Sequence, residues 1–362
     1  MKVLVAPLDW GLGHATRCIP LIKALLASGA EVELATCGPM VPLYKEVFPN
    51  LRQRRAPSYN VVYPKIGLTM PFWLMKNMAY FSKVFKLEHR WVESLVKRYG
   101  YDLIISDNRF GCYSNRVKSI YMTHQLRIGF PKGLQNFENI GIHWHLAQMK
   151  NFSEVWIPDF EEFPGLAGKL SHVKKMPPQF RYIGLLSRFN SSSESLPKEV
   201  DILGIISGVE PMRSQFEKKL KQALQKIPGN HVLLLGLPGS SIKKETFGNV
   251  TIYNHLDTAA FTAMVQKSKY VVARSGYSTI MDMAVLGASC LFIPTPGQTE
   301  QVYLAESLEE SNNAVVLSDL LLNAITIKSA LTKVHQIPTP IQNDLSLLNK
   351  AIDAVLTKQV FL

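Results

Sequence analysis

The sequence predicts an α/β fold made of two doubly wound parallel sheets, one in each half of the chain. Short apolar runs with the length of buried strands alternate with amphipathic helical segments in both halves. This alternation favours parallel sheets that are covered by helices. A chain of 362 residues is long for one core, so two domains facing each other across a cleft are expected.

The expected strands follow one another along both halves, each as a short run of mostly apolar residues. They are residues 2–7, 31–36, 102–106, 118–122 and 154–157, and then 201–207, 231–235, 250–253, 270–273 and 290–293. A polar run from Asn190 to Pro197 indicates the boundary between the halves. We therefore predict a first domain over 1–185, a linker over 186–200, a second domain over 201–340 and a C-terminal helix over 341–362.

Composition narrows the class of protein. The net charge of +12, from 40 Lys and Arg against 28 Asp and Glu, attracts anions such as a nucleotide diphosphate or an anionic membrane surface. We expect no nucleic-acid partner, because the basic residues are dispersed and no nucleic-acid module signature is present. Four widely spaced cysteines show no metal-binding pattern. With no signal peptide and no apolar run of about 20 residues to span a bilayer, a cytoplasmic or peripheral protein is expected.

The first strand is followed by a glycine-containing turn. Gly11 and Gly13 precede His14 and an amphipathic helix pattern. A dinucleotide-binding fold would have a third glycine where Thr16 stands, and an acidic residue after the second strand, where the sequence has Thr36-Cys37-Gly38. The turn by itself is weak evidence for any nucleotide, and it disfavours NAD.

A second turn of this kind lies between the strand at 270–273 and the helix that follows it. Ser275 and Gly276 form a small-residue turn, which leaves backbone N–H groups of the helix start free to bind a phosphate. Asp282 comes six residues after Gly276, and a polar cluster that contains Gln298 and Gln301 follows the next apolar run. A phosphate cradle, a carboxylate and amides in this order suit a nucleotide-sugar.

Together these motifs resemble the GT-B glycosyltransferases of the UDP-glycosyltransferase superfamily. The shared patterns are Gly-Leu-Gly-His near the start and Arg-Ser-Gly-x-x-Thr-x-x-Asp, Phe-Ile-Pro and Gln-x-Tyr near the end. Within them the chain is similar to glycosyltransferase family 28, which includes the bacterial N-acetylglucosaminyltransferase of the lipid-linked peptidoglycan precursor. The resemblance implies two Rossmann-like domains, the first on the acceptor side, and a last helix that crosses back to the first domain.

The resemblance also implies the reaction. A hexose would move from a UDP-sugar to an acceptor hydroxyl with inversion, without a cofactor or metal ion. The acceptor would be lipid-linked or part of the cell envelope, and the enzyme peripheral on the inner face of the membrane. Two other readings stay open: a GT-B sugar-nucleotide epimerase or hydrolase, and a non-catalytic nucleotide-sugar-binding subunit.

His14 is the expected general base, since imidazole accepts a proton near neutral pH. Asp107, at the end of the third expected strand, would orient it as the corresponding aspartate does in the superfamily. Asp9 is the competing carboxylate, and a histidine that only caps or packs the helix start is the alternative.

The donor site would lie mainly in the second domain. The helix start at Gly276 would hold the diphosphate, Asp282 the ribose hydroxyls, and Gln301 the sugar. An exposed arginine at a helix start is the alternative reading of Arg213. The expected donor residues are Gly13, Ser207, Gly208, Arg213, His255, Leu256, Ser275, Gly276, Ser278, Thr279, Asp282, Gln298 and Gln301.

His124, Gln125 and Arg127 are expected on the acceptor side, with Gln125 where the resembling enzyme has an acid. The segment from Leu68 to Lys86 combines aromatic and Met side chains with lysines. This pattern fits either a membrane-docking surface or the core of the domain.

Overall fold

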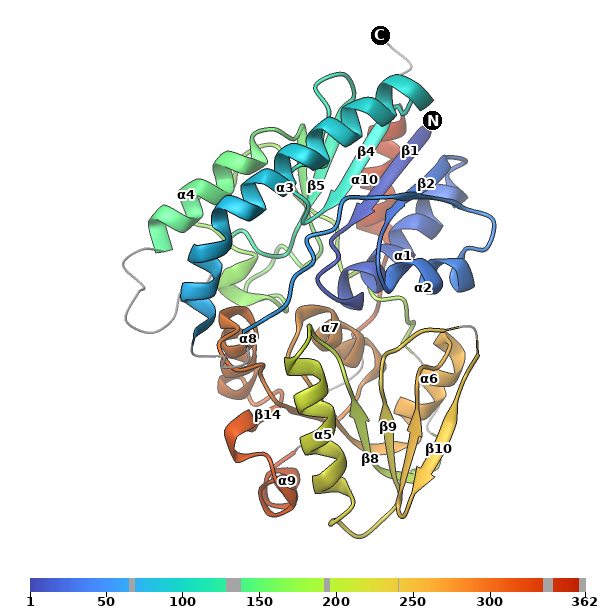
Figure 1. Cartoon of the computed structure of the whole chain (residues 1–362), viewed down its shortest axis with the longest axis vertical. Coiled ribbons are helices and arrows are strands. Elements are labelled where there is room, and N and C mark those ends of the chain that lie inside the picture. The colour runs from blue at the N-terminus through green and yellow to red at the C-terminus, as the bar shows by residue number, and fades with distance from the viewer. Residues whose placement is uncertain (65–68, 128–137, 192–195, 240, 335–340, 358–362) are drawn as a thin grey trace.

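The computed structural model describes residues 1–64, 69–127, 138–191, 196–239, 241–334 and 341–357. Figure 1 shows two α/β lobes, one above the other, each built around a twisted sheet. In the described residues each sheet has seven strands. The predicted fold class, two doubly wound sheets, is confirmed.

The first sheet has the order β3-β2-β1-β4-β5-β6-β7, and every pair of neighbours is parallel. Its strands are β1 (Lys2–Pro7), β2 (Glu31–Thr36), β3 (Arg52–Arg55), β4 (Leu103–Asp107), β5 (Lys118–Met122), β6 (Glu154–Ile157) and β7 (Phe180–Tyr182). The helices of this lobe are α1 (Leu12–Ala27), α2 (Met40–Val47), α3 (Met70–Tyr99) and α4 (Glu138–Met149).

The second sheet has the order β10-β11-β9-β8-β12-β13-β14, in which the β10–β11 pair is antiparallel and the other pairs are parallel. Its strands are β8 (Val200–Ile205), β9 (His231–Leu234), β10 (Lys244–Phe247), β11 (Val250–Tyr253), β12 (Ser268–Ala273), β13 (Cys290–Phe292) and β14 (Val315–Val316). The remaining helices are α5 (Met212–Leu224), α6 (Thr258–Gln266), α7 (Tyr277–Leu286), α8 (Thr299–Glu310), α9 (Ala324–Leu331) and α10 (Ser346–Thr357).

Four strands were absent from the sequence prediction, and all four lie at the outer edges of the sheets: β3, β7, β10 and β14. An edge strand pairs on one side only and needs no apolar run. The segment Arg52–Arg55 has no apolar side chain, and every residue of Lys244–Phe247 is exposed. The apolar pattern therefore revealed the inner strands and missed the outer ones.

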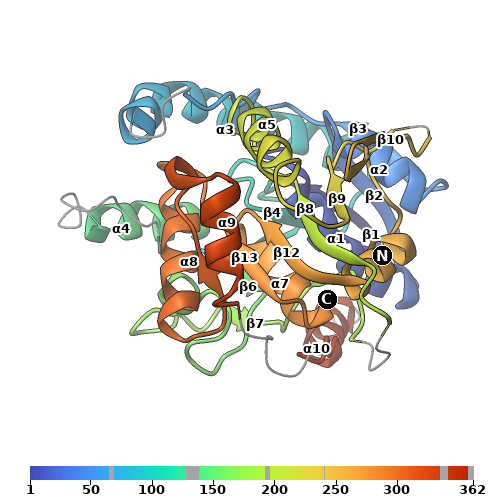
Figure 2. The same cartoon turned by 90° about the horizontal axis from the view of Figure 1, so that it is seen from below.

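Helices cover both faces of each sheet. In the second lobe α5 and α9 pack on one face, while α6 and α7 pack on the other, as Figure 2 shows from below. In the first lobe α1 lies on one face and α3 on the opposite one. The carboxyl ends of the parallel strands of both sheets point toward the junction of the lobes (Figure 1).

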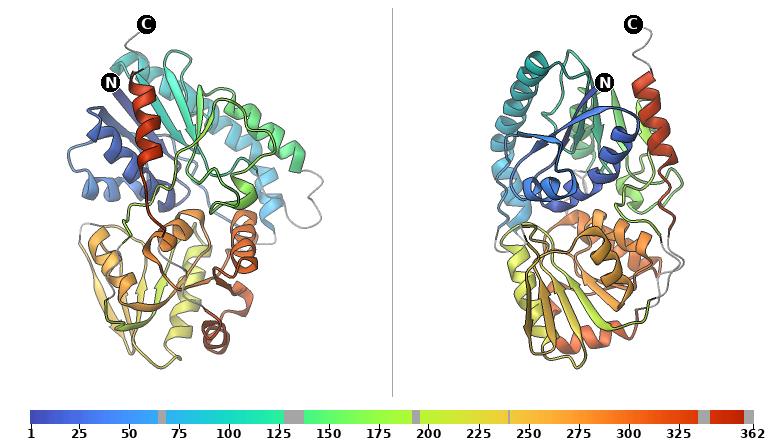
Figure 3. Two further views of the ribbon diagram at one scale, coloured as in Figure 1. Left: turned by 180° about the vertical axis from the view of Figure 1, so that it is seen from behind. Right: turned by 90° about the vertical axis from the view of Figure 1, so that its right-hand side faces the viewer.

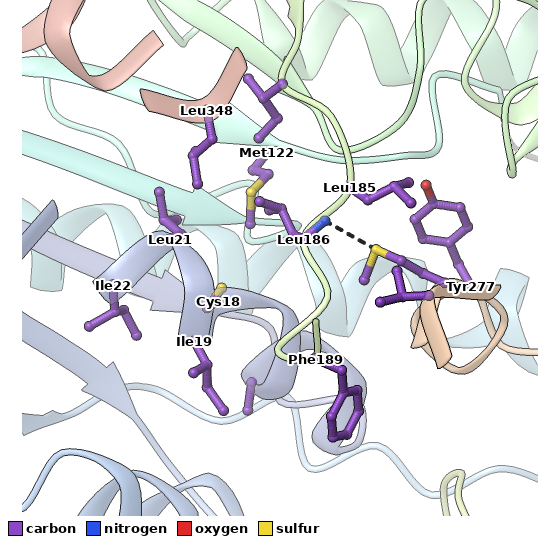
Figure 4. Packing of buried hydrophobic residues seen from close by; sticks show 14 of the residues in the cluster. Cys18, Ile19, Leu21, Ile22, Met122, Leu185, Leu186, Phe189, Tyr277 and Leu348 are labelled. Atoms are coloured by element: carbon purple, nitrogen blue, oxygen red, sulfur yellow. Dashed lines mark hydrogen bonds between the residues drawn. The ribbon is translucent and has the colours of Figure 1, made fainter. Parts of the chain in front are cut away.

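One apolar core runs through the junction. Figure 4 shows Ile19 and Leu21 of α1 close to Leu186 of the connecting segment, with Tyr277 of α7 and Leu348 of α10 nearby. The backbone amide of Leu186 lies 3.2 Å from the sulfur of Met281. The lobes therefore pack against each other through buried side chains.

The last helix, α10, lies against α1 of the first lobe, beside the opposite end of the chain (Figure 3). Its buried residues are Leu348, Ala351, Ile352 and Val355. The predicted domain limits stay predictions, and residues 192–195 of the linker and 358–362 of the tail lie outside the described residues. No helix in the described ranges is long and apolar enough to cross a membrane.

The segment predicted as core or membrane surface is divided between the two faces of α3, and its first residue, Leu68, lies outside the described residues. Phe81 and Val84 are buried in a cluster with Tyr59. Phe72 and Met75 are 75% and 72% exposed. Core packing therefore explains one face of this helix and leaves the other face free.

Candidate active site between the two sheets

His14 and Asp107 lie side by side at the carboxyl edge of the first sheet. Asp107 is the last residue of β4 and is paired in register with Pro7, the last residue of β1. Gly11, with φ of 96°, allows the sharp turn that starts α1 directly above this edge. His14 Nδ1 lies 3.0 Å from Asp107 Oδ2, so the expected contact is present.

Asp9, the competing carboxylate, is occupied elsewhere. Its Oδ2 accepts hydrogen bonds from Ser58 Oγ at 2.6 Å and from the amide of Tyr59 at 3.0 Å. It fixes the loop after β3, which identifies Asp107 as the partner of His14.

Arg17, which the sequence analysis did not single out, completes this cluster. Its side chain is buried, and its Nε donates to Asp107 Oδ2 at 3.0 Å while Nη2 donates to Oδ1. Burial opposes ionisation of Asp107, but the charge of Arg17 and the contact with His14 outweigh it and lower the pKa of the carboxyl to about 2. Asp107 is therefore a stable anion beneath His14.

Arg17 also connects the cluster to the second lobe. Its Nη1 lies 2.9 Å from His124 Nδ1, and His124 Nε2 lies 3.0 Å from Glu300 Oε1 at the start of α8. The ring of His124 stacks on Tyr277 of α7 with a centroid distance of 4.2 Å. Burial lowers the pKa of His124, and Glu300 offsets only part of this effect.

The role of His124 on the acceptor side stays a prediction. Its ring is bonded at both nitrogens and 3% of its surface is exposed, so it is a bridge between the lobes in this structure. The backbone of Gln125 forms hydrogen bonds with the hydroxyl of Thr123. Arg127 donates its backbone amide to Leu170, and its buried Nε has no partner among the described residues.

The helix start of α7 is open to a ligand. Gly276 is the N-cap, and no side chain caps the helix. Within the described residues the backbone amides of Gly276, Tyr277 and Ser278 donate no hydrogen bond, whereas the amide of Thr279 donates to Gly276. Three N–H groups at the positive end of the helix dipole can therefore bind an anion.

Neighbouring residues hold this helix start in place. Ser275 is buried, and its Oγ donates to the carbonyl of Gln301 at 2.8 Å. Gln301 Oε1 accepts from the amide of Thr295, which leaves its Nε2 directed toward Gly276. Ser275 thus supports the site structurally, while Gln301 faces it.

The loop that carries His14 lies directly on this helix start. Ser278 Oγ donates to the carbonyl of Gly13 at 3.1 Å, although the two residues are 265 positions apart. A Cβ atom at Gly13 would lie 3.1 Å from the same hydroxyl. This contact brings the histidine of the first lobe and the free amides of the second lobe into one site.

Asp282 is farther along α7 and faces the segment that connects the lobes. Its Oδ1 accepts from Ser187 Oγ at 2.6 Å, and its Oδ2 makes no hydrogen bond in the described part of the chain. Burial raises the pKa of Asp282 to about 6, and the nearby charge of Arg188 limits this rise.

The guanidinium of Arg213 is held by two groups of the protein. Its Nη2 donates to the carbonyl of Leu235 at 2.6 Å, and its Nη1 donates to Glu217 at 2.9 Å. The guanidinium fixes the end of β9 to α5, and its contact with the diphosphate stays a prediction.

The remaining donor candidates lie at strand ends of the second sheet. Ser207 and Gly208 follow β8, and Gly208 has φ of 113° with open space where a Cβ would stand. His255 and Leu256 follow β11, and the backbone groups of both make no hydrogen bond among the described residues. Gln298 is the N-cap of α8. In the described ranges, no group of three or more His, Cys, Asp or Glu side chains has the arrangement of a metal site.

The sequence did contain a signal for Arg17. It stands three residues after His14, on the face of α1 that otherwise carries buried apolar residues such as Cys18 and Leu21. A charged side chain on a buried helix face requires a partner of opposite charge. Glu300 carried no comparable signal, because its partner His124 is 176 residues away.

This chain is similar to known glycosyltransferases. Residues 212–355 match the glycosyltransferase family 28 C-terminal domain. An uncharacterized glycosyltransferase of Methanosarcina mazei is 27% identical over 335 residues, which cover 88% of this chain and 86% of the relative. The predicted resemblance to family 28 is therefore confirmed.

Solved structures share the fold. The spinosyn forosaminyltransferase SpnP has a TM-score of 0.59 at 14% identity, with 98% of this chain and 93% of that chain covered. MurG of Acinetobacter baumannii has a TM-score of 0.51 at 14% identity, with 98% and 94% covered. The predicted GT-B fold is confirmed.

Proposed function

We propose that this chain, a glycosyltransferase of the GT-B type, transfers a hexose from a UDP-sugar to an acceptor hydroxyl with inversion of configuration. One observation carries the proposal. The His14–Asp107 pair of the first lobe is joined to the uncapped start of α7 through the contact between Gly13 and Ser278. A base and an anion cradle thus face the same space.

The donor would bind mainly to the second lobe. The diphosphate would accept hydrogen bonds from the free amides at Gly276 and Ser278, which make a metal ion unnecessary. The uracil edge would pair with backbone groups of His255 and Leu256, and Asp282 Oδ2 would accept a ribose hydroxyl. Gln301 Nε2 would donate to the sugar.

The reaction is a single displacement. His14 donates a hydrogen bond from Nδ1–H to Asp107 Oδ2, and its Nε2 is then free to accept the proton of the acceptor hydroxyl. The acceptor oxygen forms a bond to the anomeric carbon while the bond from that carbon to the β-phosphate oxygen breaks. UDP leaves with the electron pair, and the amides at Gly276 stabilise its charge.

The acceptor would be carried by a lipid at an anionic membrane surface. Phe72 and Met75 are exposed and three residues apart on α3, and the exposed Lys76 and Lys83 lie on the same helix. Figure 1 shows that α3 begins near the junction of the lobes, close to α8. A protein that docks by the start of α3 would bring the junction of its lobes close to the membrane.

Vesicle flotation tests this surface. Replacing Phe72 and Met75 by serine should abolish binding to vesicles of anionic lipid and leave the melting temperature unchanged. Leu320→Ser is the matched control, because Leu320 is 85% exposed on the second lobe, and it should bind as wild type does. Absence of wild-type binding to anionic vesicles would exclude the membrane surface.

Calorimetric titration of UDP in the presence of EDTA tests the donor site. The wild-type chain should bind, and Asp282→Ala should weaken binding by roughly 1–3 kcal/mol because ribose hydroxyls lose their partner. Asp353→Ala, on the exposed face of α10, is the control and should bind UDP normally. Binding that requires a divalent metal, or an unchanged affinity in Asp282→Ala, would contradict this donor site.

A further inference from the structure

A continuous chain of polar contacts crosses from the first lobe to the second. It runs from His14 and Asp107 through Arg17 to His124 and then to Glu300, with the distances given above. Asp107, Arg17 and His124 are 0%, 2% and 3% exposed. Buried polar groups keep their partners, because water cannot replace a lost contact.

The direction of the two hydrogen bonds made by the His124 ring follows from Arg17. A guanidinium always carries its protons and only donates. His124 Nδ1 must therefore accept from Arg17 Nη1, and a neutral imidazole then carries its proton on Nε2. That proton is donated to Glu300 Oε1, so Arg17 selects the tautomer that holds the second lobe.

The charged groups around His124 come from three elements. Arg17 of α1 faces Nδ1, Glu300 of α8 faces Nε2, and the ring of Tyr277 of α7 covers one side. The imidazole of His14 lies on the far side of the same guanidinium, where its Nδ1 is 3.0 Å from both Arg17 Nη2 and Asp107 Oδ2. Because Nη2 already donates to Asp107 Oδ1, the Nδ1 proton of His14 is assigned to Asp107 Oδ2. Arg17 is thus in contact with His14, with His124 and with the carboxylate of Asp107.

We propose that Arg17 is a positioning residue that couples the base of the first lobe to the donor side of the second. It holds Asp107 beside His14, and it fixes His124 as the donor to Glu300, the neighbour of Gln301 in the donor site. The effect of this coupling on sugar transfer rests on the proposed function. The assignment of the His124 tautomer is independent of that function.

Nuclear magnetic resonance of the full chain labelled with ¹⁵N-histidine tests the proposal. The ¹⁵N shifts report which ring nitrogen carries the proton, and the His124 signals are identified by their loss in His124→Gln. In wild type His124 should be protonated at Nε2 and unprotonated at Nδ1. Protonation at Nδ1 would overturn the proposal.

Two variants separate the influence of Arg17 from that of Glu300. Arg17→Lys keeps the charge but cannot reach Asp107 and His124 together, so the single tautomer should be lost. Glu300→Ala should keep the Nε2 tautomer, since Arg17 still donates to Nδ1. A tautomer that changes in Glu300→Ala, or stays fixed in Arg17→Lys, would contradict the assignment.

Arg109→Lys is the matched control. Arg109 is also fully buried in the first lobe, and its Nε donates to Glu88 at 2.8 Å without contact to either histidine. In the Arg109→Lys variant the His124 signals should match those of wild type.

A turnover assay tests the effect of Arg17 on the reaction. With an active donor and acceptor pair, Arg17→Lys should reduce turnover while the dissociation constant of UDP stays at the wild-type value. Loss of UDP binding in Arg17→Lys would instead show that the side chain only supports the fold.

Discussion

Replacement of Asp282 by asparagine should stabilise the protein and weaken its donor binding at the same time. The carboxyl of the half-buried Asp282 accepts from Ser187, and desolvation raises its pKa from 3.8 to about 6. A shift of about 2 units corresponds to roughly 3 kcal/mol at about 1.4 kcal/mol per unit. Asparagine keeps an oxygen that can accept from Ser187 and carries no charge to bury.

The sign of the effect depends on pH. A carboxyl with a raised pKa in the folded state binds its proton more tightly when folded than when unfolded. Its contribution to stability is complete below pH 3.8, and it is lost as the pH rises through about 6. Asp282→Asn should therefore match wild type in acid and exceed it by up to about 3 kcal/mol at neutral pH.

Urea unfolding over this pH range measures the difference directly. The variant should gain stability mainly between pH 3.8 and about 6, and its affinity for UDP should fall. Asp353→Asn, on the exposed face of α10, should follow the wild-type curve throughout. Equal stability of Asp282→Asn and wild type at neutral pH, or a less stable variant, would refute the reasoning.

Three further substitutions have defined outcomes. Gly111→Ala would place a Cβ 2.1 Å from the carbonyl oxygen of Phe85, so the free energy of unfolding should fall by about 1–3 kcal/mol or more. An unchanged melting temperature would contradict this packing. Arg213→Ala should lower the free energy of unfolding in urea by about 1–3 kcal/mol, because the hydrogen bond to the carbonyl of Leu235 is lost. Calorimetry should show no change in UDP affinity, and weaker UDP binding would indicate that Arg213 binds the diphosphate. Ile352→Ala, 1% exposed in α10, should lower the free energy of unfolding by about 2–5 kcal/mol, and no loss would exclude α10 from the core.

The sequence was informative where burial dictates residue type. The inner strands β1, β4, β8 and β12 each contain an apolar run, so their positions could be predicted, and the ends of these strands located the turns at Gly13 and Gly276. Edge strands such as Arg52–Arg55 have no such requirement, and their pairing depends on a neighbour that the local sequence does not specify.

The candidate site was only partly predictable for a related reason. A strand end followed by Asp107 and a turn followed by His14 are local features, and parallel pairing brings them together. The direction of a long side chain is not local. Arg213 turns to the carbonyl of Leu235, and Arg17 turns inward to Asp107, and these acceptors lie 22 and 90 positions away in the sequence.

The central claim is that His14 accepts the proton of the acceptor while the donor binds to the other lobe. Turnover of a UDP-sugar by His14→Ala, measured beside the dissociation constant of UDP and with a lipid extract as the source of acceptor, tests it most directly. A general base contributes about 10² to 10⁴ in rate, so turnover should fall by that factor while the dissociation constant stays unchanged. Turnover at the wild-type rate in His14→Ala would contradict the account.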